Sequence, residues 1–286
     1  MKILRKIIKI IKNPRSLYES INYRIAPLAG SKPPNDRYSY SDMFFWRCDI
    51  ESDTLFSYTP YVDIISLGKA RLGSQFRRAK LLILSSNGDI IKNIDIETLP
   101  LTNKHISIRD VLGSNYIENQ TNNYGSFLIF HENVPDSKFL EGGFLAERGY
   151  VSYRFSGINT SSFVHGNLDA ISNEFKNTLL SKMIPMRSSV FKRRIDLQLL
   201  FKNDFKYDLC FTNPTNSNQQ VTLNVFDTSN HVLEIINFSI QHYGSFLYTY
   251  VPRQEDTRIR IYSKHPFPRP LIFLENRKGY RDVFHG

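Results

Sequence analysis

The pentapeptide Tyr-Gly-Ser-Phe-Leu stands at residues 124–128 and returns unchanged at residues 243–247, each time followed shortly by Val-Pro. Three further similarities keep the same order along the chain. They pair 84–91 with 226–233, 144–150 with 273–280, and 163–166 with 283–286. Ordered similarities of this kind indicate an internal duplication. The sequence therefore predicts two related halves, with an extra loop and helical turn near residues 97–120 in the first.

Short runs within these halves alternate between apolar and polar residues, as half-buried strands do. The clearest runs are 195–201, 207–211, 221–225 and 259–261, and Asn-, Thr- and Ser-rich turns separate them. Strands at this spacing favour antiparallel sandwiches over βαβ units. The predicted fold class is mainly β, with two duplicated antiparallel β-sandwich domains, an N-terminal amphipathic helix and a helical connector.

The expected organisation has five parts. A helix covers 1–25, a Pro-rich linker 26–36, the first sandwich 37–166, a helical connector 167–187 and the second sandwich 188–286. The connector is expected because Leu168, Ile171, Phe175, Leu179 and Met183 follow helical spacing before Pro185. A short helical turn is expected at 108–113, ended by Gly113.

The run from Phe211 to Ile240 combines a strand, an Asn-Pro turn, a second strand and an Asp-Thr-Ser-Asn turn. In this it resembles tandem bacterial immunoglobulin-like or fibronectin-like β-sandwich modules. The resemblance is one of fold, because the Cys…Trp…Cys pattern of immunoglobulin domains is absent. Modules of that kind bind or space other molecules, which is what the resemblance implies here.

Positive charge is concentrated at the N-terminus. The chain carries 37 Lys and Arg against 27 Asp and Glu, and the first 24 residues hold seven of the bases and one acid. Isoleucines and cations fall on opposite faces of a helix there, an arrangement suited to an anionic membrane surface. The expected contacts are Lys2, Ile3, Arg5, Lys6, Ile7, Lys9, Ile10, Ile11 and Lys12.

The same apolar face could instead dock on the protein's own body, and that alternative is equally open. Nucleic acid is an unlikely partner, because the remaining bases are mixed with acids. Without a secretory signal, a cytoplasmic location is expected, at the inner face of the membrane. The oligomeric state is left open.

The sequence contains no nucleotide-binding loop, nucleophile elbow or zinc motif. No cofactor or metal site is therefore expected. Cys48 and Cys210 stand in apolar strand-like contexts and are predicted to be buried free thiols.

Candidate ligand-binding residues come from the two matched C-terminal segments, since Arg binds anions and Tyr stacks on sugar rings. They are Arg148, Tyr150, Tyr153, Arg154 and His165 in the first half and Arg277, Tyr280, Arg281 and His285 in the second. The alternative is that these residues pair with neighbouring Glu side chains and complete the core, and this alternative is the favoured one.

The expected function is a non-catalytic binding or assembly protein at a membrane surface, recognising a glycan, an anionic ligand or a protein partner. One alternative is a carbohydrate-active enzyme that uses a carboxylate pair drawn from Glu132, Glu147 or Glu275. Another is a structural β-module of a phage or surface assembly.

Overall fold

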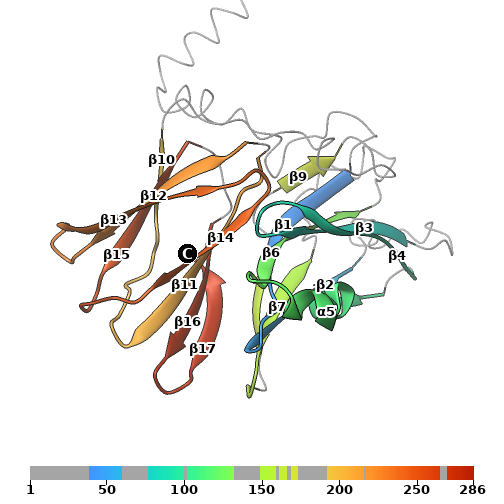
Figure 1. The fold of residues 1–286 in the computed structure, drawn as a ribbon, viewed down its shortest axis with the longest axis horizontal. Coiled ribbons are helices and arrows are strands. Elements are labelled where there is room, and N and C mark those ends of the chain that lie inside the picture. The colour runs from blue at the N-terminus through green and yellow to red at the C-terminus, as the bar shows by residue number, and fades with distance from the viewer. Residues whose placement is uncertain are drawn as a thin grey trace, which may run out of the picture.

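The computed structural model describes residues 39–59, 77–99, 102–131, 149–158, 161–165, 169–172, 192–215, 217–264 and 269–286. The predicted N-terminal helix, the linker and most of the predicted connector lie outside these residues. The described part is mainly β, as predicted, with four antiparallel sheets (Figure 1).

The described residues between 39 and 172 form nine strands and two short helices. They are β1 (Ser39–Arg47), β2 (Ser52–Tyr58), β3 (Arg77–Ser85), β4 (Ile90–Thr98), β5 (Lys104–Ser107), α4 (Ile108–Leu112), α5 (Ser114–Glu118), β6 (Tyr124–His131), β7 (Tyr150–Phe155), β8 (Ser161–His165) and β9 (Asp169–Ser172). The first sandwich consists of a sheet in the order β4-β3-β6-β1-β9 and a sheet in the order β5-β2-β7-β8.

The described residues between 193 and 285 form eight more strands. They are β10 (Arg193–Asp196), β11 (Phe205–Thr212), β12 (Gln219–Phe226), β13 (Val232–Ile240), β14 (Ser245–Tyr250), β15 (Arg258–Ser263), β16 (Leu271–Asn276) and β17 (Arg281–His285). The second sandwich has the sheets β10-β15-β12-β13 and β14-β11-β16-β17.

The two sandwiches share one topology. If β1 to β8 are matched in order to β10 to β17, every strand neighbour in the first sandwich has its counterpart in the second, apart from the added β9. The hairpins β3–β4 and β12–β13 even break register at the same place, between Ile83 and Leu84 and between Val225 and Phe226. This is the position at which the sequence similarity of 84–91 with 226–233 aligns them.

Two of the sequence similarities do not reflect equivalent positions. The first Tyr-Gly-Ser-Phe-Leu lies in β6, whose counterpart is β15, whereas the second opens β14, the counterpart of β5. Tyr150 faces His165 in the β7–β8 ladder, and it is Leu271 that faces His285 in the β16–β17 ladder. Tyr150 is thus the counterpart of Leu271, and its expected match to Tyr280 was wrong.

The predicted connector helix is wrong where the structure describes it. Residues Asp169–Ser172 form β9, which pairs antiparallel with β1 through Tyr40 and Ile171. The helical spacing of apolar residues was misleading because an edge strand on a sheet also needs intermittent apolar residues. The sandwich class is confirmed, but the strand orders are not the A-B-E-D and C-F-G orders of immunoglobulin domains.

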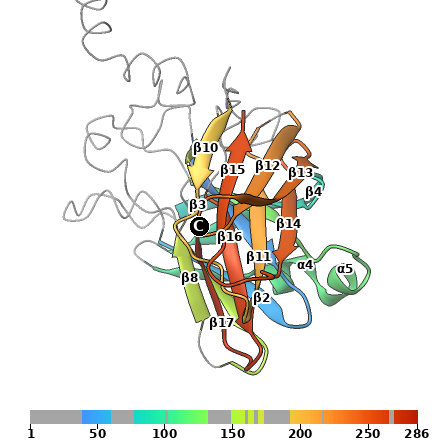
Figure 2. The ribbon, with the colours of Figure 1, turned by 90° about the vertical axis from the view of Figure 1, so that its left-hand side faces the viewer.

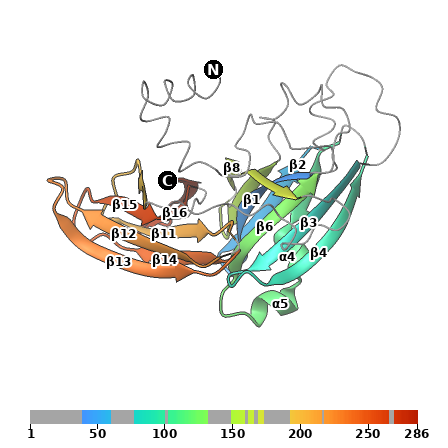
Figure 3. The same ribbon diagram turned by 90° about the horizontal axis from the view of Figure 1, so that it is seen from above.

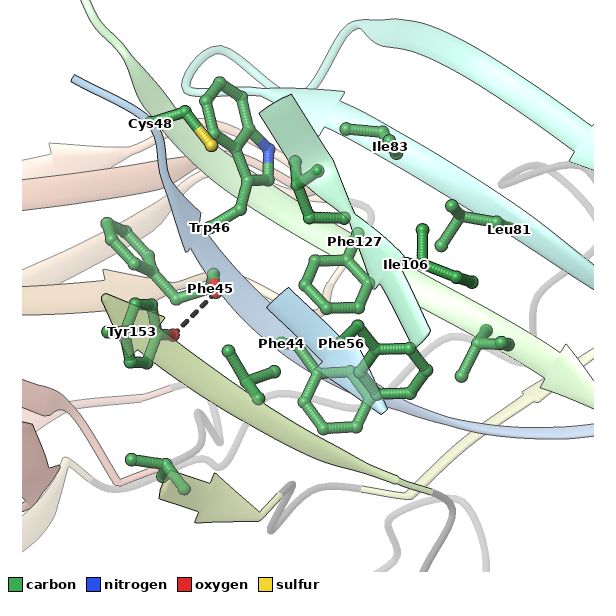
Figure 4. Close-up of a cluster of buried hydrophobic side chains, with 14 of the residues drawn as sticks. Phe44, Phe45, Trp46, Cys48, Phe56, Leu81, Ile83, Ile106, Phe127 and Tyr153 are labelled. Atoms are coloured by element: carbon green, nitrogen blue, oxygen red, sulfur yellow. Dashed lines mark hydrogen bonds between the residues drawn. The ribbon is translucent and has the colours of Figure 1, made fainter. Parts of the chain in front are cut away.

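Aromatic rings fill the core of the first sandwich (Figure 4). Phe44 of β1, Phe56 of β2 and Phe127 of β6 pack with centroids 4.9 to 5.2 Å apart, so the two sheets meet through these rings. Trp46 donates its indole N–H to the carbonyl of Leu84 at 2.9 Å. Offset and edge-on ring packing of this kind adds about 1 kcal/mol per pair beyond area burial.

The two sandwiches pack against each other through a shared hydrophobic cluster. Phe273 of β16 packs edge-on against Tyr153 at 4.8 Å, and Cys210, Leu271 and Val283 join the same buried cluster. Both cysteines are free and buried, as predicted. In Figure 2, β8 and β17 lie side by side, and Ser162 Oγ donates to Asp282 Oδ1 across them at 2.6 Å.

An insertion distinguishes the first sandwich from the second. Between β5 and β6 the chain forms α4 and α5, whereas residues 251–257 connect the counterpart strands β14 and β15. The insertion includes the predicted helical turn at 108–113, which is confirmed as α4 with Gly113 at its C-terminal end. Figure 3 shows α5 projecting from the first sandwich beside the ends of β3 and β4.

Candidate functional site

A polar groove lies between the insertion and the β3–β4 hairpin, with a volume of about 830 Å³. We call it the α5 groove. Its walls come from residues 85–92 on one side and from Leu112, α5 and residues 120–122 on the other. Ligand pockets of proteins fall in about this size range.

The insertion takes its shape from local capping. Ser107 Oγ accepts a hydrogen bond from the Asp110 amide at 3.1 Å and so begins α4. Gly113 has φ of 84°, a left-handed conformation that ends α4 and lets α5 start at once. Asn119 Nδ2 then donates to the Asn115 carbonyl at 2.7 Å, which closes α5 on itself.

The opposite wall is held by the second sandwich. The Ser245 amide donates to the Ser86 carbonyl at 2.8 Å, and Gly88 lies tightly against the His242 carbonyl. Gly88 has φ of 88°, so a side chain there would be strained as well as blocked. Within the turn, Ser85 Oγ accepts from the amides of Asn87 and Asp89. This wall is therefore fixed before any ligand arrives.

Neutral polar side chains dominate the α5 groove. The amides are Asn87, Asn115, Gln120 and Asn122, and the hydroxyls are Ser85, Ser86, Thr121 and Tyr116. One acid, Asp89, and one base, Lys92, balance each other among the lining residues. A groove without net charge does not favour an anion over a neutral molecule.

Tyr116 gives the α5 groove an aromatic surface. Its ring is half-buried and packs against the core, which leaves part of it turned to the groove. Burial, and to a lesser extent the charge of Asp89, raises the pKa of Tyr116 above its ordinary value. The phenol is therefore neutral at physiological pH and can both donate and accept a hydrogen bond.

The residues proposed from the first matched segment have different surroundings. Arg148 lies outside the described residues, as does the side chain of His165. Tyr153 is fully buried, and its hydroxyl donates to the Phe45 carbonyl at 2.7 Å (Figure 4). Tyr150 is 40% exposed and lines a separate cavity, and Arg154 is exposed.

The residues from the second segment gather at the β16–β17 hairpin. Arg281 donates to Glu275 at 2.6 Å and pairs with Glu51 of the first sandwich at 3.1 Å. Tyr280 is 54% exposed, with its hydroxyl 3.3 Å from Asp282, and Arg277 is exposed. His285 faces Leu271 in the ladder. Arg281 thus serves the joint between the sandwiches.

The carboxylates suggested for an enzyme are only partly described. Glu275 forms an ion pair with Arg281 at 2.6 Å. Glu132 and Glu147 lie outside the described residues. Within the described ranges, no three His, Cys, Asp or Glu side chains gather in a way that could hold a metal ion. The helices in that same part of the chain are too short or too polar to span a bilayer.

Sequence reasoning did not identify the α5 groove. Its residues are ordinary loop residues such as Asn, Ser, Gln and Thr, which carry no motif. The available signal was the extra segment near 97–120 in the first half, which the comparison of the halves did reveal. Tyr116, the aromatic residue inside that segment, was the residue to select.

Comparisons with known proteins give no family. No protein-family model matches the chain, and no curated protein matches its sequence. A β-glucuronidase from glycoside hydrolase family 2 is similar over 91% of this chain and 25% of its own, with 8% identity and a TM-score of 0.19.

Two further solved enzymes give the same result. A calcium-binding mutant of Bacteroides uniformis β-glucuronidase 2 shows 11% identity over 86% of this chain and 26% of its own, with a TM-score of 0.18. A glycosyl hydrolase family 2 member from Bacteroides cellulosilyticus DSM 14838 shows 8% identity over 90% of this chain and 30% of its own, with a TM-score of 0.17. The chain thus spans 25% to 30% of the length of these enzymes. TM-scores this low carry no functional argument, so the site has to be judged by its own geometry.

Proposed function

We propose that this chain is a non-catalytic binding protein that takes a neutral glycan in the α5 groove. The observation that carries the proposal is the lining of the groove, with four amides, four hydroxyls and no net charge around one half-buried tyrosine. Sugar rings present hydroxyls that donate and accept together with apolar C–H faces. Amide and hydroxyl side chains match the first feature and an aromatic ring matches the second.

The second sandwich supports the proposal as an internal comparison. Its β12–β13 turn is the counterpart of the β3–β4 turn, but among the described residues no helix stands opposite it, because residues 251–257 take the place of the insertion there. Instead, His231 Nδ1 and Asp227 Oδ2 lie 3.0 Å apart and form a hydrogen bond within the turn. The insertion, which the second copy lacks, is thus the feature that builds the groove, and loops on rigid sheets are where binding residues concentrate.

Contact of residues 1–25 with an anionic membrane stays part of the proposal as a prediction from the sequence. It would place the glycan-binding sandwich near lipid-linked glycans at the inner face of the membrane. Failure of the full chain to float with anionic vesicles at low salt would contradict it.

The glycan proposal is tested by binding to an array of neutral and anionic oligosaccharides. The full chain is expected to bind neutral glycans, and Tyr116→Ala is expected to lower the affinity about tenfold or more. Because Tyr116 also contacts the core, Asn122→Ala is measured beside it. Asn122 is exposed, so its loss should weaken binding while the melting temperature stays unchanged.

Tyr280→Ala is the matched control, since Tyr280 is an exposed tyrosine outside the groove. It is expected to bind like the unmodified chain. If Tyr280→Ala loses binding while Tyr116→Ala retains it, the ligand lies at the C-terminal hairpin and the groove assignment is refuted. Binding confined to anionic glycans would refute the charge argument.

A further inference from the structure

Two more cavities follow the α5 groove along the side of the first sandwich. The next one, of about 410 Å³, lies where the edge strands β4 and β5 approach each other, and Val111 of α4 lines it. Its neighbour Leu112 lines the α5 groove. A third cavity, of about 330 Å³, contains Ser57, His105 and Tyr150, and His105 also lines the second. The second and third cavities thus share a lining residue, and α4 lines both the α5 groove and the second cavity.

The second cavity lies at the seam between the two sheets, where β4 and β5 approach each other, and the corresponding seam is closed in the second sandwich. There the counterpart edge strands β13 and β14 meet through Phe238 and Phe246, whose rings stack at 4.2 Å. In the first sandwich β5 is only four residues long and leads directly into α4. Lys104, Ser107 and Asp110 line the seam cavity in place of a ring stack. Among the described residues, the ring stack thus closes the second copy at the place where the first copy is open.

The third cavity also differs from the matching position of the second sandwich, where the described residues are apolar. Ser57 faces both His105 and Tyr150 in the strand ladders, and Ser57 Oγ lies 2.8 Å from His105 Nδ1. The counterpart of Ser57 in the second sandwich is Cys210, which faces Leu247 and Leu271. Those apolar residues pack into the cluster that joins the sandwiches. The first copy thus keeps polar, exposed groups where the second copy has an interface.

We propose that the three cavities are subsites of one binding track for an extended glycan chain, with Tyr116 at one end and Tyr150 at the other. The proposal rests on the glycan-binding function proposed above and adds that the ligand is a polymer. The edge strand β4, from Ile90 to Glu97, runs beside the track for about 24 Å at the usual rise per residue. That length exceeds what one or two sugar rings would occupy. Tyr150, which is 40% exposed, offers a second stacking ring.

The test measures affinity against chain length. Dextran, laminarin, xylan and mannan are offered to the full chain, and the one that binds most tightly is hydrolysed and separated by size. Affinity is expected to rise with fragment length. Tyr150→Ala is expected to lower affinity about tenfold for the intact polysaccharide and to leave the shortest binding fragment unaffected. Tyr116→Ala is expected to weaken both.

The outcomes separate the two proposals. If Tyr150→Ala and His105→Ala bind every length as the unmodified chain does, while Tyr116→Ala fails, the extended track is wrong and the groove stands. If affinity does not change with length, the track is likewise wrong. If none of the four polysaccharides binds, or if Tyr116→Ala binds all of them normally, the glycan function itself is refuted.

Discussion

Replacing Arg47 with alanine is expected to destabilise the folded chain by about 3–5 kcal/mol. The guanidinium bonds Asp49 at 2.5 Å and Asp208 of the second sandwich at 2.8 Å, and it lies 5.2 Å over the ring of Phe273. The side chain of Asp208 is only 9% exposed, so removing Arg47 leaves a nearly buried carboxylate without its cation. Chemical denaturation of the full chain measures the loss.

The loss should depend on pH. Burial alone would raise the pKa of Asp49, but the charge and hydrogen bond of Arg47, with hydrogen bonds from Ser52 and the Glu51 amide, lower it below the ordinary value. A carboxyl whose pKa is lowered in the folded state stabilises the fold above about pH 4. That stabilisation is lost as the pH falls through the folded-state pKa. Arg47→Ala should therefore weaken the acid dependence of stability below about pH 4.

Two variants isolate the cause. Arg154→Ala removes an exposed arginine of the same sandwich and should change stability by no more than about 0.5 kcal/mol. Arg47→Met with Asp208→Leu removes both charges and should cost less than Arg47→Ala alone. If the double variant is the less stable of the two, the buried-charge explanation is wrong.

Replacing Gly125 with alanine is expected to cost about 3 kcal/mol or more. A Cβ atom there would press on the Leu84 carbonyl and would come within 2.7 Å of Trp46 Nε1. Those are the two groups joined by the buried indole hydrogen bond, so the methyl group disturbs both the packing and that bond. Thermal unfolding followed by tryptophan fluorescence reports on it, since the chain has one tryptophan.

Gly157→Ala provides the control for this prediction. Gly157 has φ of 77°, but apart from its own atoms and its two chain neighbours no described residue lies within 4 Å of the position that a Cβ would take, so only the backbone cost of about 1 kcal/mol applies. If Gly125→Ala and Gly157→Ala lose the same amount of folding stability, the close approach of Gly125 to Trp46 is unimportant.

The alternation of apolar residues was enough to predict strands and sandwiches, because side chains on a half-buried strand alternate by geometry. The hairpin similarity of 84–91 with 226–233 also identified truly equivalent elements. The repeated pentapeptide did not identify equivalent elements, although both copies pack against the end of β3. Gly125 lies against the Leu84 carbonyl and Gly244 against the Ser86 carbonyl, so both glycines permit close approach to the end of β3.

The pentapeptide's serines form no side-chain hydrogen bond that would explain their presence. Within the described residues, Ser126 Oγ and Ser245 Oγ are buried without a hydrogen-bond partner. Their small size, which admits neighbouring chains, explains their presence better. An identical sequence here reflects a shared packing requirement and not a shared position.

The joint between the sandwiches was beyond sequence reasoning. Arg47 and Asp208 are separated by 161 residues, and neither stands in a pattern that points to the other. The position of the α5 groove could be predicted in part, because comparing the two halves reveals the insertion. Its lining residues could not be predicted, since Asn, Ser and Thr in loops usually serve turns.

Hydrogen exchange of the full chain, with and without the neutral polysaccharide that binds most tightly, tests the glycan assignment most directly. The account predicts slower exchange over residues 85–92 and 111–122, with no change at the counterpart turn, residues 227–231. Protection confined to the β16–β17 hairpin, or equal protection of both turns, would contradict it.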